Sequence, residues 1–118
     1  MGTQEVMEQL AVLAGLDERE IERYWPLGES ARVQVASLAK PEIGMKGERA
    51  LRDTAAALAF YRWTLLHAAL GEESSFTAGD VRATKNKTDV ATARQFWREA
   101  EAAASPYLND EGFVFEQM

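Results

Sequence analysis

The stretch Gly47–Leu70, GERALRDTAAALAFYRWTLLHAAL, decides the fold of this chain. From Ala55 onward it is apolar on almost every side, and only an arginine, a threonine and a histidine interrupt it. A helix that is apolar all round belongs inside a bundle or between subunits. We therefore predict a central helix over 47–70, about 36 Å long, which Gly71 ends as a left-handed C-terminal cap.

The composition agrees with a single helical domain over residues 1–118. The chain has 118 residues and only three prolines. It has no cysteine, and this absence excludes disulfides, thiolate catalysis and cysteine-based zinc sites. Met1–Leu10 carries acids where a signal peptide needs bases, and the central apolar run is too short and too polar to span a membrane. We expect an all-α, intracellular protein with no membrane contact.

A first helix is predicted to begin at Thr3 as its N-cap and to end at Gly15. Between these two residues the apolar side chains keep the spacing of one helix face. They are Val6, Leu10 and Leu13.

Two further short helices are expected before the central one. Asp17 and Glu20 have the spacing of a capping box, and Pro26 is expected to close the helix that they open. Ser30 is the expected cap of a third helix, which ends near Leu38 before the breakers Pro41 and Gly44. Its predicted inner face consists of Val33 and Ala36, with Val35 as a further candidate.

Beyond the central helix we predict a long loop over 71–87, one more helix, and an apolar tail over 106–118. The last helix is expected to begin at Thr88 or Asp89 and to stop at Ser105-Pro106. We place Arg94, Arg98 and Glu101 on its solvent face. The predicted buried stripe is Val90, Ala93, Trp97 and either Ala100 or Ala104. The fold class is thus an all-α bundle of about five helices around a long central one.

Charge is distributed unevenly along the chain, whose formal net charge is −6. Residues 1–29 hold seven acidic side chains against two arginines, whereas 82–98 hold five basic side chains against one aspartate. The net charge argues against sequence-specific nucleic-acid binding, since phosphate contacts need a basic face. Patches of opposite sign suit self-association or a charged partner, and a solvated mixed surface is the alternative.

Catalytic chemistry has little support in the residue pattern. His67, the sole histidine, lacks the Glu-x-x-His spacing of carboxylate-bridged metal bundles, so we interpret it as a packed, hydrogen-bonded histidine. No serine lies in a nucleophile-elbow motif. We therefore expect no enzymatic activity, no cofactor and no metal. Arg62 needs a polar partner from another segment or subunit, unless its guanidinium reaches solvent at the edge of the bundle.

The tail carries Phe113 and Phe115, two rings that would stay in water unless they dock. Docking each is worth roughly 1.5–3 kcal/mol. The rings either close over this chain's own core or reach a neighbouring subunit.

The C-terminal half resembles a known family. A helix with a Tyr–Arg–Trp region is followed by FTAGDVRATKN and then by WREAEAAASPYLNDEGFVFEQ. This order of elements resembles the head-tail connector or adaptor proteins of tailed phages and prophages. The likeness covers most of the chain in the order of its elements, and 78–81 and 106–115 more closely. The acidic N-terminal third has no counterpart in it.

The resemblance implies a mostly α-helical, non-enzymatic subunit that forms a ring beneath the portal. Its partners would be further copies of itself, the portal and tail-completion proteins. It would be found in the bacterial cytoplasm during assembly, and in the virion if the phage is active. The candidate interface residues are Arg62, Phe76, Val81, Arg82, Phe113 and Phe115. A bacterial helical adaptor or regulator and a small helical enzyme or metal protein are the alternatives.

Overall fold

The computed structural model describes residues 1–70 and 89–109, and 84% of these are helical. In chain order the helices of this part are α1 (Thr3–Ala14), α2 (Glu18–Arg23), α3 (Trp25–Ser37), α4 (Gly44–Leu70) and α6 (Val90–Ala104), followed by the 3₁₀ turn η2 (Ser105–Tyr107). No strand occurs among them. The predicted all-α fold is confirmed.

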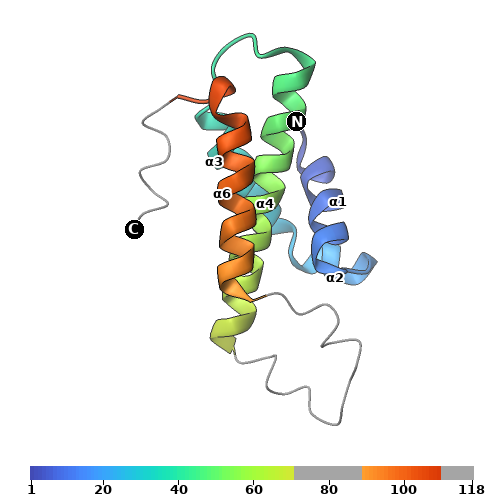
Figure 1. Ribbon diagram of the computed structural model, residues 1–118. Coiled ribbons are helices and arrows are strands. Elements are labelled where there is room, and N and C mark those ends of the chain that lie inside the picture. The colour runs from blue at the N-terminus through green and yellow to red at the C-terminus, as the bar shows by residue number, and fades with distance from the viewer. Residues whose placement is uncertain (71–88, 110–118) are drawn as a thin grey trace.

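Helix α4 is the central element, and α1, α3 and α6 all pack along it (Figure 1). Seven consecutive residues, Thr54 to Phe60, are buried, so this part of α4 is enclosed on every side. The last two turns are different, because Leu65, Leu66 and Leu70 are 39%, 38% and 60% exposed. The middle of α4 is therefore enclosed within the bundle, whereas the described residues do not enclose its C-terminal end.

The start of α4 also differs from the prediction. The helix begins at Gly44, whose φ of 73° is in the left-handed region, rather than at Gly47. Gly47 is buried inside the helix where η2 approaches: a Cβ atom there would lie 2.9 Å from Cδ1 of Tyr107. The absence of a side chain at this position allows that close approach.

The caps of α1 and α2 follow mostly from local signals. Gly15 ends α1 with φ 70°, as predicted, but Gly2 rather than Thr3 is the N-cap. Asp17 caps α2 with the predicted reciprocal bonds: its Oδ1 accepts from the Glu20 amide at 2.9 Å, and its own amide donates to Glu20 Oε1 at 3.1 Å.

Helix α3 begins at Trp25, five residues before the predicted cap Ser30. Pro26 lies in its first turn, where the missing amide hydrogen costs no helical bond, so it opens α3 instead of closing α2. The face of α3 that packs on the core also differs from the predicted one. Gly28, Ala31 and Val35 are buried, whereas the expected core residues Val33 and Ala36 are exposed.

Of the two predicted caps of α6, Thr88 and Asp89, the N-cap is Asp89, whose Oδ1 accepts from the Thr92 amide at 2.7 Å. Of the predicted stripe, Ala93, Trp97 and Ala104 are buried, whereas Val90 is only partly buried. Glu101, expected to face water, is only partly exposed.

After η2 the chain binds the end of α3. Ala39 and Leu108 form an antiparallel bridge, the Lys40 amide donates to the Tyr107 carbonyl at 2.9 Å, and the Asn109 amide donates to the Leu38 carbonyl at 2.9 Å. Leu108 is 1% exposed. The first part of the predicted tail therefore packs on this chain's own core.

No helix in the described ranges is both long enough and apolar enough to cross a membrane.

Candidate functional site

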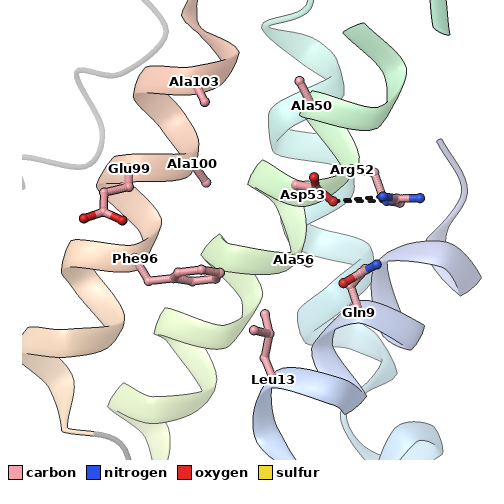
Figure 2. A pocket seen from close by; sticks show the side chains of 10 residues that line it. All are labelled: Gln9, Leu13, Ala50, Arg52, Asp53, Ala56, Phe96, Glu99, Ala100 and Ala103. Atoms are coloured by element: carbon pink, nitrogen blue, oxygen red, sulfur yellow. Dashed lines mark hydrogen bonds and ion pairs between the residues drawn. The ribbon is translucent and has the colours of Figure 1, made fainter. Parts of the chain in front are cut away.

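A groove of about 550 Å³ runs between α1 and α6, with α4 as its floor (Figure 2). Gln9 and Leu13 come from α1, and four residues come from each of the other two helices. These are Ala50, Arg52, Asp53 and Ala56 on α4, and Phe96, Glu99, Ala100 and Ala103 on α6.

Small side chains give the groove its shape. Two of the four lining residues on α4 and two of the four on α6 are alanines, which leave open space between the longer side chains. The larger Phe96 and Leu13 face each other across one end (Figure 2). Phe96 packs edge-on against Phe60, with ring centroids 6.4 Å apart, yet 40% of its surface is exposed. The groove is thus an apolar surface that the described helices leave uncovered.

The groove carries more negative than positive charge. Its lining contains two carboxylates, Asp53 and Glu99, and one guanidinium, Arg52. Arg52 Nε and Nη2 donate to Asp53 Oδ1 at 3.2 and 3.0 Å, and Gln95 Nε2 donates to Glu99 Oε2 at 3.1 Å. Because Asp53 is 55% exposed, it can still meet a basic side chain of a partner.

The predicted interface residue Arg62 lies on α4, on the side of α3. Its Nη2 donates to Oε1 of Gln34 on α3, so its partner does come from another segment. Partial burial lowers the pKa of Arg62. Among the described residues no carboxylate forms an ion pair with it, so a neutral amide, and no acid, receives this cation. Its role at an interface stays a prediction.

The other five predicted interface residues lie outside the described residues. They are Phe76, Val81, Arg82, Phe113 and Phe115. Whether they meet Arg62 stays a prediction.

His67 belongs to an aromatic cluster with Tyr24 and Trp63 near the C-terminal end of α4. Its Nε2 lies 3.1 Å from the Tyr24 hydroxyl oxygen, and its ring centroid lies 4.2 Å from that of Trp63. This confirms the prediction of a packed, hydrogen-bonded histidine. In residues 1–70 and 89–109 no three histidine or acidic side chains are grouped so that they could hold a metal.

The groove was not predicted from the sequence. One residue in the sequence hinted at it: Phe96 is an aromatic residue that lies beside the predicted buried stripe of the last helix instead of within it. The alanines of α4 and α6 gave no signal, since alanine is common in any helix. Only the placement of α1 and α6 on either side of α4 turns these residues into one surface.

Comparison with protein-family models, with curated proteins and with solved structures finds no match to this chain.

Proposed function

We propose that this protein is a structural subunit of a phage or prophage head-tail junction. In this proposal copies of the chain assemble into a ring and contact the portal and tail-completion proteins. The proposed setting is the bacterial cytoplasm during assembly, and the virion if the phage is active. The assignment to a head-tail junction comes from the sequence resemblance, and the all-α fold with a long central helix agrees with it.

The observation that carries the proposal is the uncovered groove between α1 and α6. A phenyl ring that is 40% exposed, a leucine and four alanines form a surface that a protein helix can cover. Small residues at helix surfaces allow another backbone to approach closely, at the short end of the 8–10 Å range of interaxial distances. The alanine methyl groups offer no nucleophile and no proton donor, and the carboxylates of Asp53 and Glu99 each accept a hydrogen bond from a neighbour on their own helix, so the groove suits binding better than catalysis.

The exposed end of α4 adds to this support. Leu65, Leu66 and Leu70 are each more than a third exposed, and no acidic or basic residue occurs in 63–70 apart from His67. Apolar surface of this kind marks protein interaction sites when it is contiguous.

A helical adaptor or regulator that binds a different protein is the second candidate. The same groove supports it, because an amphipathic helix from any partner could lie there. The two candidates differ in what the purified chain does alone, since a ring subunit self-associates and an adaptor does not need to.

The test measures the mass of the full chain by sedimentation velocity over a wide range of concentrations. A ring subunit is expected to form a species of fixed, closed stoichiometry. Phe96→Glu should abolish this species, whereas Val12→Glu should not, because Val12 is 79% exposed and does not line the groove. Circular dichroism verifies that both variants fold. A chain that stays monomeric at the highest concentration overturns the proposal.

A further inference from the structure

A second groove, of about 520 Å³, lies between the end of α3 and the first turns of α4. We call it the α3–α4 groove. Its apolar lining consists of Met1, Ala36, Ala39, Ile43, Met45 and Leu51. Met45 is 79% exposed, and the volume is within the range of roughly 300–1,000 Å³ that is typical of binding pockets. The described residues therefore leave a second apolar surface open.

The described part of the chain ends beside this groove. Ala39, which lines the groove, forms the antiparallel bridge with Leu108. Asn109, the last described residue, donates its amide to the carbonyl of Leu38 at 2.9 Å. The residues that follow Asn109 therefore start at the edge of the α3–α4 groove.

The tail beyond Asn109 is long enough to reach the groove and carries apolar side chains that suit it. It has nine residues, 110–118, and includes Phe113 and Phe115. In an extended segment, residues two positions apart point to the same side, so both rings can face one surface. At up to about 3.5 Å per residue, Phe113 reaches about 14 Å from Asn109 and Phe115 about 21 Å.

Charge distinguishes the two grooves as sites for this tail, because residues 110–118 hold three carboxylates and no basic side chain. The groove between α1 and α6 has two carboxylates against one guanidinium, so it repels an acidic segment. The charged residues of the α3–α4 groove are Lys40, Glu42 and Glu48. Glu48 Oε1 accepts from the amino group of Met1 at 2.7 Å, which leaves Lys40 and Glu42 to balance each other. The α3–α4 groove is therefore the better site.

We propose that Phe113 and Phe115 bind in the α3–α4 groove of their own chain. A segment tethered at Asn109 meets this groove at an effective concentration on the order of millimolar, which favours the contact within one chain over a contact with a second copy. The proposal selects the first of the two alternatives for the tail, closure over this chain's own core. It goes beyond the proposed function and does not depend on assembly, since the groove between α1 and α6 stays free.

Protection of a single thiol tests the contact, because the chain has no cysteine of its own. Ala36→Cys places a thiol in the groove at a position that is exposed among the described residues. Its rate of reaction with N-ethylmaleimide is measured in the full chain, with and without the pair Phe113→Ser and Phe115→Ser. The pair should raise the rate at least about tenfold, since burial of one phenyl ring exceeds the free energy of a tenfold change in an equilibrium.

Two matched variants serve as controls. Val12→Cys should react at the same rate with and without the serine pair, because Val12 is 79% exposed and lies outside the groove. Val114→Ser should leave the thiol of Ala36→Cys protected, because in an extended segment Val114 points away from the side of the two rings. Circular dichroism verifies that each variant keeps its helices, and Phe115→Ser alone replaces the serine pair if the pair unfolds the protein.

Four results would overturn the proposal. The first is an equal rate for Ala36→Cys with and without the two rings. The second is protection that grows with protein concentration, which would place the tail on another copy. The third is protection of Ala103→Cys instead of Ala36→Cys, which would place the tail in the groove between α1 and α6. The fourth is a loss of protection in Val114→Ser as large as that in the serine pair.

Discussion

Trp97 and Phe96 are adjacent aromatic residues on α6, and the structure predicts very different costs for removing them. Trp97 is 1% exposed and belongs to the core cluster. Replacement of a buried tryptophan by alanine costs about 3–5 kcal/mol, from lost burial and from the cavity that remains. Native domains are stable by only about 5–15 kcal/mol, so Trp97→Ala should remove a large part of the total.

Phe96→Ala is the matched control, because it makes a similar change one position away in the same helix. The Phe96 ring keeps 40% of its surface exposed. Scaling the burial energy of a phenylalanine accordingly gives a cost of about 1–2 kcal/mol. Both variants gain similarly from the helix propensity of alanine, so the difference between them reports burial.

Urea denaturation followed by circular dichroism measures both free energies of unfolding without relying on tryptophan fluorescence. Thermal denaturation gives a second measure of the same loss. The midpoint of Trp97→Ala should fall by roughly 12–20 °C, at about 4 °C per kcal/mol for a domain of this size. The m-value should stay unchanged if both variants unfold in a two-state manner. Equal costs for the two substitutions would refute the placement of α6 against α4, since Trp97 could not then be the buried residue.

Two further predictions concern the ends of helices. The bonds from Thr92 lower the pKa of Asp89, so its contribution to stability is present above the unfolded value of about 3.9 and is lost as the pH falls through the lower folded value. Asp89→Asn keeps a capping side chain but has no carboxylate to protonate, so it should lose less stability on acidification than the parent protein. Urea titrations at several pH values measure this loss, and an equal loss in both proteins would contradict the prediction. Gly15 ends α1 with φ 70°, where a Cβ atom is strained by about 1–2 kcal/mol. Gly15→Ala should destabilise the protein by that amount, and the stability of Gly15→Asn should lie between those of the parent and of Gly15→Ala. If thermal denaturation shows no loss of stability for Gly15→Ala, α1 ends in another way.

The candidate site could be predicted only in part. For Arg62 the sequence left open a polar partner from another segment, a partner from another subunit, and a guanidinium that reaches solvent, and in the structure Arg62 donates to Gln34 of α3. The groove could not be predicted, because Leu13 and Phe96 are 83 positions apart in the sequence and meet only through α4. The predicted contacts of the 71–87 loop and of the two tail phenylalanines lie outside the described residues and stay predictions.

The sequence by itself determined the features that depend on a few neighbouring residues. The capping box at Asp17 and Glu20, the glycine stop after α1, the cap at Asp89 and the buried stripe around Trp97 all follow from local hydrogen bonding and helical periodicity. The enclosed middle of α4 follows as well, since an uninterrupted apolar run has no side that water favours.

Only the tertiary structure decided where α3 begins and which of its faces is buried. Pro26 is compatible both with the end of one helix and with the first turn of the next, so the local signal is ambiguous. Packing against α1 and α4 selects the face with Gly28 and Ala31, because these small residues let the helices approach closely. Val33 is left outside as a consequence, since one side of a helix can face the core only if the other faces away.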